Sequence, residues 1–287
     1  MNLRKKKFIR IIPRLDIKNN FLIKGINLEG LRVLGEPYQF AKFYSETGAD
    51  EIHYFDSVAS LYGTNNLGNL INITAKNLNI PLCVGGGIRS IEDIENTLNF
   101  GADKISINTA FIENPKLVSL AAKKFGSSTI SASIEYIRID KKVFISKANG
   151  RDLVKIDPIT WSKKLIDLGV GELIVTSVNH EGLMKGFDKD IVKEISNFST
   201  VPVLIHGGAK NIENIYDIIS ETNIDGVVIA SILHYETLKK FKIPKNKQIG
   251  NLEFLKEKIQ DSFEKKISIS EYKNFLNKKR INVRNDF

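Results

Sequence analysis

Cysteine is almost absent from this 287-residue sequence. Cys83 is the only one, so no internal disulfide can form and a reducing compartment, the cytoplasm, is expected. Long apolar runs are missing too, and none approaches the roughly 20 residues of a membrane-spanning helix. Arg10 and Pro13 break the apolar stretch after the basic start, which argues against a signal peptide. The four histidines show no metal-ligand spacing, so no metal site and no cofactor are predicted.

The net charge of +9 would suit a nucleic-acid partner, but its distribution does not. Residues 241–287 hold 12 Lys and Arg against 6 Asp and Glu, so +6 of the charge lies in the last sixth of the chain. The remainder shows no basic stripe interleaved with aromatic residues. We therefore predict a solvated basic surface, with a polyanionic partner as the alternative, and no nucleic-acid binding.

An internal repeat is the most informative pattern that is present. The segment 81–94 (PLCVGGGIRSIEDI) returns at 202–215 (PVLIHGGAKNIENI), a shift of 121 residues. Residues 48–52 (GADEI) return at 169–173 (GVGEL) with the same shift. A repeat of this length indicates two similar halves, each with a glycine-rich turn after its third predicted strand.

Short runs rich in Ile and Val alternate with helical patterns. Strands are predicted at residues 8–15, 51–55, 81–84, 104–107, 129–134, 172–176, 203–205 and 226–229. Helices are predicted between them, at residues 37–47, 67–78, 91–100, 115–125, 158–168, 188–197 and 211–222. Ser90 is the predicted N-cap of the helix that begins at Ile91.

Eight β/α units in series predict a closed parallel (β/α)8 TIM barrel, a single domain over residues 1–287. A doubly wound open sheet is the alternative, but two four-unit halves close naturally into one ring. A Lys-rich stretch at about 238–266 is predicted to be an insertion before a last helix at 269–276. It is either a solvated surface elaboration or a partner-docking element. The chemistry of such barrels lies on the loops that follow the strands.

The two glycine turns, Gly85–Gly87 and Gly207–Gly208, each follow a strand and precede a helix. Glycine lets backbone N–H groups approach an anion, and the helix dipole favours negative charge there. With the hydroxyls of Thr109 and Ser231, two such turns could hold the two phosphates of one elongated substrate. The alternative is a pair of tight turns that bind no ligand.

Charged residues fall at both ends of the predicted barrel. Asp16 and Glu135 end the first strands of the two halves, so we expect them to face each other across the mouth as general acid and base. The alternative is a structural role in which one of them pairs with a nearby Lys.

At the opposite end, four charges of alternating sign lie at or near the starts of strands: Arg10, Glu51, Lys104 and Glu172. An ordinary ion-pair ring is the simplest interpretation of this set, since that face conventionally carries stability.

Four motifs together resemble the cyclase subunit of imidazole glycerol phosphate synthase: residues 11–18 (IIPRLDIK), Lys24-Gly25, 84–90 (VGGGIRS) and 101–108 (GADKISIN). The resemblance covers nearly the whole chain apart from the insertion. It implies a TIM-barrel lyase of histidine biosynthesis that receives ammonia from a glutaminase subunit docked at the N-terminal face as a heterodimer. The ammonia converts a bisphosphorylated aminoimidazole carboxamide ribonucleotide into imidazole glycerol phosphate and aminoimidazole carboxamide ribotide.

The resemblance also implies roles for individual residues. Asp16 and Glu135 occupy the catalytic carboxylate positions, and the charged set of four matches the family's gate at the ammonia entrance. The residues implied to bind substrate and its phosphates are Lys24, Gly86, Gly87, Asn108, Thr109, Ser177, Gly207, Gly208 and Ser231.

Several positions depart from the family pattern, and they cluster in the second half of the site. Glu135 stands where the family has Asp, and His206 stands where it has Ser. The loops at residues 148–154 and 179–183 also differ. Two other functions therefore stay open. One is a paralogue that uses channelled ammonia to form an amidine on a bacterial surface sugar, and the other is a catalytically weak scaffold barrel.

Overall fold

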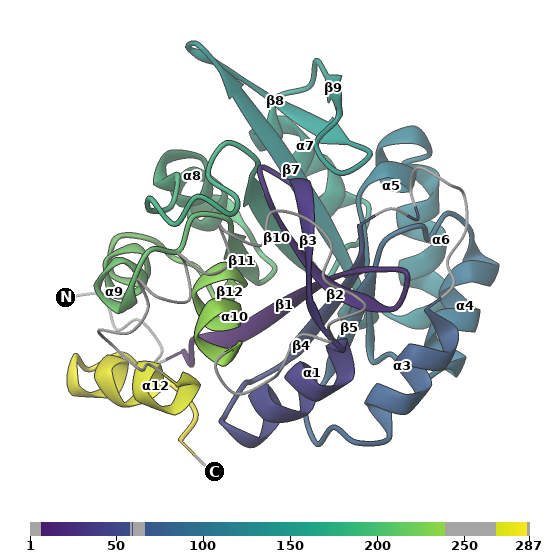
Figure 1. The fold of residues 1–287 in the computed structure, drawn as a ribbon. Helices are drawn as coiled ribbons and strands as arrows, with labels where there is room; N and C mark the ends of the chain where they lie inside the picture. Colours follow the sequence, from purple (N-terminus) through teal and green to yellow (C-terminus); the bar gives the residue numbers. More distant parts are fainter. Residues whose placement is uncertain (1–6, 58, 60–66, 239–267, 286–287) are drawn as a thin grey trace.

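A computed structural model describes residues 7–57, 59, 67–238 and 268–285. In this part of the chain, eight parallel strands pair in sequence, and the last pairs with the first to close a barrel (Figure 1). They are β1 (Arg10–Lys18), β4 (Ile52–Asp56), β5 (Leu82–Gly85), β6 (Lys104–Ile107), β7 (Ile130–Ile139), β10 (Glu172–Ser177), β11 (Val203–His206) and β12 (Gly226–Ile229). All eight predicted strands and the TIM barrel are thereby confirmed. The predicted insertion, apart from Leu238, lies outside the described residues.

Helices pack around the outside of the barrel (Figure 1). The predicted ones are α1 (Pro37–Glu46), α3 (Gly68–Ala75), α4 (Ile91–Asn99), α6 (Lys116–Phe125), α7 (Pro158–Asp167), α8 (Lys189–Phe198), α9 (Ile212–Glu221) and α12 (Ile269–Lys278). The predicted cap of α4 is confirmed, because Ser90 and Asp93 form a reciprocal capping box. Two short helices were not predicted, α5 (Thr109–Glu113) after β6 and α10 (Ser231–Thr237) after β12, nor was the 3-10 turn η1 (Ser127–Thr129).

Two antiparallel hairpins extend the barrel above its mouth, and sequence patterns did not predict them. One is formed by β2 (Phe21–Ile26) and β3 (Glu29–Gly35), the other by β8 (Lys142–Lys147) and β9 (Asp152–Val154) (Figure 1). They continue from β1 and β7, the first strands of the two halves. Asp16 pairs with Ile23 in the first hairpin, and Glu135 pairs with Ser146 in the second. The hairpins therefore repeat the two-fold relation seen in the sequence.

The hydrophobic core is divided in two. A large outer core fills the layer between the sheet and the helices. A small inner core fills part of the barrel interior, where Ile12, Phe55, Ile174, Leu204 and Val228 meet. The rest of the interior holds buried polar side chains, including Thr176 and His206. Within the described residues, no helix combines the length and apolarity that a membrane span requires.

Candidate active site

The four charges at the N-terminal face form a ring of ion pairs. Arg10 donates through Nη1 to Glu51 at 3.0 Å and through Nη2 to Glu172 at 2.5 Å. Lys104 donates from Nζ to Glu51 at 3.0 Å and contacts Glu172 at 3.4 Å. Burial alone would raise the pKa of Glu51, but His53, Lys104 and Arg10 lower it to about 2. The structure therefore brings all four sequence-predicted ring residues together, and Glu51 is held ionised.

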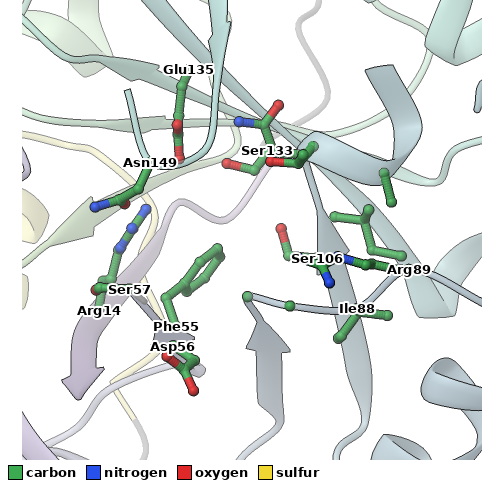
Figure 2. Close-up of a pocket in the computed structure, with 16 residues that line it drawn as sticks. Arg14, Phe55, Asp56, Ser57, Ile88, Arg89, Ser106, Ser133, Glu135 and Asn149 are labelled. Carbon is green, nitrogen blue, oxygen red and sulfur yellow. The ribbon is translucent and has the colours of Figure 1, made fainter. Parts of the chain in front are cut away.

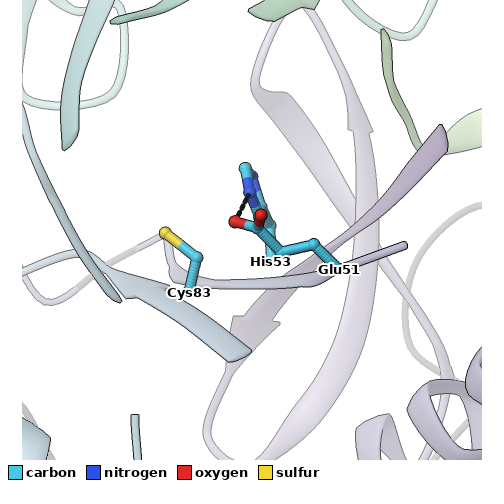
Figure 3. Close-up of side chains that lie close together, drawn as sticks. All are labelled: Glu51, His53 and Cys83. Atoms are coloured by element: carbon cyan, nitrogen blue, oxygen red, sulfur yellow. Dashed lines mark hydrogen bonds and ion pairs between the residues drawn. The ribbon is translucent and has the colours of Figure 1, made fainter. Parts of the chain in front are cut away.

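His53 and Cys83 lie directly beside this ring, inside the barrel (Figure 3). Nε2 of His53 lies 2.9 Å from Oε1 of Glu51. Ligand atoms of Glu51, His53 and Cys83 approach within 4.8 Å of one another, close enough for a metal ion. The charges of Arg10 and Lys104 on the same carboxylate oppose a further cation there. We therefore interpret Glu51 and His53 as a hydrogen-bonded pair within the ring, with the buried thiol of Cys83 beside them.

At the opposite face, pockets lined by described residues include two that each contain one of the predicted glycine turns. The first is lined by Gly86, Gly87, Asn108 and Thr109 from the first half of the chain (Figure 2). The second is lined by residues of the second half, among them Gly207, Gly208 and Ser231. The repeat thus places one glycine-turn pocket from each half of the chain on one face of the barrel.

Both turns need glycine for the same physical reason. Gly86 has φ of +95°, and a Cβ there would lie 2.3 Å from the carbonyl oxygen of Asp56. Gly207 has φ of +90°, and its Cβ would lie 2.8 Å from the carbonyl oxygen of Ser177. A side chain at either position is both strained and blocked by backbone.

Asp16 and Glu135 end β1 and β7 and lie in different electrostatic environments. Nε of Arg14 donates to Asp16 at 2.8 Å, and Nζ of Lys24 lies 3.7 Å from it. Burial opposes ionisation of Asp16, but these two cations lower its pKa below the usual range. Burial raises the pKa of Glu135 to about 7, although Arg14 and the N–H of Gly150 act against the shift. One carboxylate is thus held ionised while the other is poised to exchange a proton near neutral pH.

A buried ion pair connects the two halves of the mouth. Lys24 on β2 donates to Glu181 in the loop after β10, and both side chains are 1% exposed. Glu181 also accepts a hydrogen bond from the N–H of Leu28 at 3.1 Å. Because Asp16 lies beside Lys24, the charges alternate across the mouth from Arg14 to Glu181.

This geometry agrees with the comparisons to known proteins. Residues 10–239 match the family model described as histidine biosynthesis protein. The chain belongs to that family. It is 46% identical over 206 residues to "Imidazole glycerol phosphate synthase subunit HisF" of Legionella pneumophila, an alignment covering 71% of this chain and 97% of the relative. The proteins of the same name from Prochlorococcus marinus and Sulfurisphaera tokodaii are 39% and 38% identical, over 82% and 80% of this chain and 93% and 92% of their own lengths. The resemblance drawn from the sequence motifs is confirmed.

Not all of the residues predicted to bind substrate line the two pockets of this family member. Lys24 is buried against Glu181 instead, and Ser177 bonds through its hydroxyl to Nδ1 of His180 at 2.9 Å. Asn108 donates from Nδ2 to the carbonyl oxygen of Ser146. The hydroxyl of Thr109 accepts from the N–H of Ala148, which directly follows β8. Lys24 lies on β2 of the first hairpin and Ser177 ends β10, so both belong to the mouth of the barrel.

Sequence reasoning overlooked two charged residues of the mouth in this histidine biosynthesis protein. Arg14 lies two residues before Asp16 on β1, so the two side chains share one face of the strand. That period alone could have identified Arg14 as a mouth residue. Glu181 falls within the loop at 179–183 that departs from the family pattern, but its partner Lys24 is 157 residues away. No local signal pairs them.

Proposed function

We propose that this protein is the cyclase subunit of an imidazole glycerol phosphate synthase. It uses ammonia from a glutaminase subunit to convert a bisphosphorylated aminoimidazole carboxamide ribonucleotide into imidazole glycerol phosphate and aminoimidazole carboxamide ribotide. The carrying observation is that two repeat-related glycine pockets share the barrel mouth with Asp16 and Glu135, two carboxylates whose pKa values shift in opposite directions, and that Glu135 lines the first pocket. The proposal includes a cytoplasmic location, a single barrel domain over residues 1–287 and no organic cofactor.

The two carboxylates supply the acid–base chemistry of this proposal. Asp16 is ionised because Arg14 and Lys24 stabilise its charge, so it can accept a proton from the attacking nitrogen. Glu135 is protonated for much of the time near pH 7, so it can donate a proton to an oxygen of the substrate. The glycine turns and the hydroxyls of Thr109 and Ser231 hold the two phosphates and fix the substrate between the carboxylates.

The charged ring supports the part of the proposal that concerns ammonia delivery. Arg10, Glu51, Lys104 and Glu172 surround the axis of the barrel at the face opposite the pockets. Ammonia released by a glutaminase at that face would pass the ring before it reaches Asp16 and Glu135. A ring of side chains can open and close without moving the barrel strands. This supports a glutaminase partner in a heterodimer, docked at the N-terminal face.

Turnover of the histidine-pathway substrate with ammonium salt, at alkaline pH and without glutaminase, tests the proposal. We expect the purified protein to form imidazole glycerol phosphate, and Asp16→Asn to abolish the reaction while the far-UV circular dichroism is unchanged. A folded protein that shows no turnover on this substrate would reject the assignment.

A second candidate is amidine formation on a surface sugar with the same channelled ammonia. The observation that favours it is the altered mouth, where Glu135 is one methylene longer than Asp and His206 lines the second pocket. A longer carboxyl is displaced by roughly 1 Å, which is enough to weaken a positioned proton transfer. Glu135→Asp separates the candidates: a gain in turnover of the histidine-pathway substrate favours the first. Turnover of an amide-bearing sugar by the wild type alone favours the second.

A further inference from the structure

Arg14 is a buried cation in the mouth of the barrel. Its side chain is 2% exposed, and the guanidinium carbon lies 4.1 Å from the centre of the Phe55 ring. Nε donates to Asp16, while Nη1 is buried and finds no hydrogen-bond partner among the described residues. A buried donor without a partner is costly to a folded protein, and a bound ligand that accepts from it would remove that cost.

The backbone of Arg14 is held as firmly as its side chain. Its carbonyl oxygen is 2.8 Å from Nε2 of His234, and a carbonyl can only accept, so His234 carries its proton on Nε2. Nδ1 then accepts from the hydroxyl of Tyr44 at 2.7 Å. Burial lowers the pKa of His234 to about 4, which keeps this arrangement in its neutral form. The guanidinium is therefore fixed before any substrate arrives.

Other unpartnered polar atoms line the same pocket as Arg14. The hydroxyls of Ser106 and Ser133 and Oδ1 of Asn108 are buried without a hydrogen-bond partner in the described structure. Figure 2 shows Arg14, Ser106, Ser133 and Glu135 directed toward one space. A cationic donor, two hydroxyls and a protonated carboxyl together suit an oxygen that gains negative charge during a reaction.

We propose that Arg14 is a catalytic residue that binds the oxygen of the carbonyl group whose carbon ammonia attacks. This rests on the proposed ammonia-dependent function and holds for either acceptor. Nitrogen forms a bond to the carbonyl carbon while the C=O π electrons move to oxygen, which Arg14 stabilises. Glu135 gives that oxygen its proton, and Asp16 takes one proton from the nitrogen. The product of this step is a neutral carbinolamine, so protons and electrons balance.

A merely structural role would leave a different signature. If Arg14 served only to keep Asp16 ionised, its loss would matter where Asp16 takes up a proton and would disappear at alkaline pH. Arg14→Lys would also restore activity, because it keeps a positive charge near Asp16. If Arg14 donates to the reacting oxygen, the planar guanidinium group itself is needed. A lysine ammonium cannot place its N–H groups at the same positions or in the same plane.

The first experiment measures ammonia-dependent kcat and KM for the wild type, Arg14→Lys and Arg14→Met across the pH range. We expect kcat to fall about 100-fold or more in both variants at every pH, which is the effect of removing one donor to a reacting oxyanion. The KM for the carbonyl-bearing substrate should change far less. Arg138→Lys, an arginine paired with Asp188 outside this pocket, is the matched control and keeps wild-type kcat. Recovery of either Arg14 variant at alkaline pH would overturn the proposal.

A second experiment decides the proposal even if the histidine-pathway substrate is not turned over. Acetamide, the smallest stable probe with an amide carbonyl, is titrated into the full-length 15N-labelled protein, and the guanidinium signals of Arg14 are followed by NMR. We expect a saturable shift of these signals that Arg138 does not share. Absence of wild-type turnover together with this shift rejects the proposed function and keeps the carbonyl site. Unchanged Arg14 signals reject the carbonyl site itself.

Discussion

Glu51 and Glu172, two glutamates 121 residues apart in the repeat, bind the same two cations. Arg10 bridges them on one side of the ring and Lys104 on the other. Each cation thus has two carboxylate partners, and the set has no net charge. Displacing one side chain is enough to open such a ring. Lys104 is suited to this movement, because its compact ammonium group is carried on a flexible stem.

Replacing Lys104 by methionine should uncouple ammonia delivery from the reaction. The variant keeps Arg10 between the two glutamates but leaves one side of the ring without a cation. We expect glutamine-dependent turnover, measured with a glutaminase partner, to fall relative to glutamine hydrolysed, while turnover with free ammonium stays near wild type. Lys124→Met, which removes a surface pair with Glu95, is the control. Unchanged coupling in Lys104→Met would show that the ring is structural only.

Glu135 should make the protein less stable at alkaline pH. The folded state keeps its proton up to about pH 7, whereas the unfolded chain releases it near 4.5. The favourable contribution is complete below pH 4.5 and is lost as pH rises through 7, by about 3 kcal/mol in all. Glu135→Gln, which stays neutral, should therefore raise the urea midpoint at pH 8 but barely at pH 5. A gain of equal size at both pH values would contradict this account.

The same carboxyl sets the alkaline limb of the activity profile. If the protonated form of Glu135 donates to the substrate, kcat at saturating ammonia should decline above about pH 7. The decline should vanish in Glu135→Gln, whose residual activity, lower by about 100-fold or more, should be flat with pH. A wild-type kcat that instead rises through pH 7 would assign Glu135 as a base.

The barrel was predictable because its determinants are local, whereas parts of the site are not. Runs of Ile and Val bounded by glycine or polar residues mark each barrel strand, and both glycine turns repeat in register. The hairpins over the mouth escaped prediction because charged residues and glycines interrupt the apolar runs of β2 and β3, and charged residues bound that of β8. The charged residues of the mouth were harder to predict. The ion pair of Lys24 with Glu181 joins residues 157 positions apart, and the raised pKa of Glu135 depends on its burial in the folded protein.

Alanine at Gly86 should disrupt the first pocket. Its Cβ would meet the carbonyl of Asp56 at 2.3 Å, so the backbone of the turn must move. We expect KM for the bisphosphorylated substrate to rise by an order of magnitude or more, with a loss of stability of about 1–3 kcal/mol. Gly30→Ala is the control, since it has φ of +63° but nothing within 4 Å of its Cβ. Equal effects of both substitutions would attribute the loss to backbone strain alone.

Lys273 should contribute more to stability than any exposed lysine of its helix. From α12 it donates to Asp50 at 2.6 Å, with a side chain that is 0% exposed, and Asp50 in turn accepts from the N–H of Ile11 at 2.7 Å on β1. The ion pair thus anchors the last described helix to the first barrel strand. Burial lowers the pKa of Lys273 although Asp50 acts against the shift, so the bond holds a desolvated charge.

Removing one partner of such a pair leaves the other buried and unpaired, which costs about 3–5 kcal/mol when nothing replaces it. Here Nε of Arg284 lies 3.3 Å from Asp50 and remains, so we expect Lys273→Met to cost about 2 kcal/mol, measured by urea unfolding. The exposed Lys278→Met, on the same helix, should change stability by less than about 0.5 kcal/mol. Equal losses from the two variants would mean that the methionine side chain, not the lost ion pair, affects the helix.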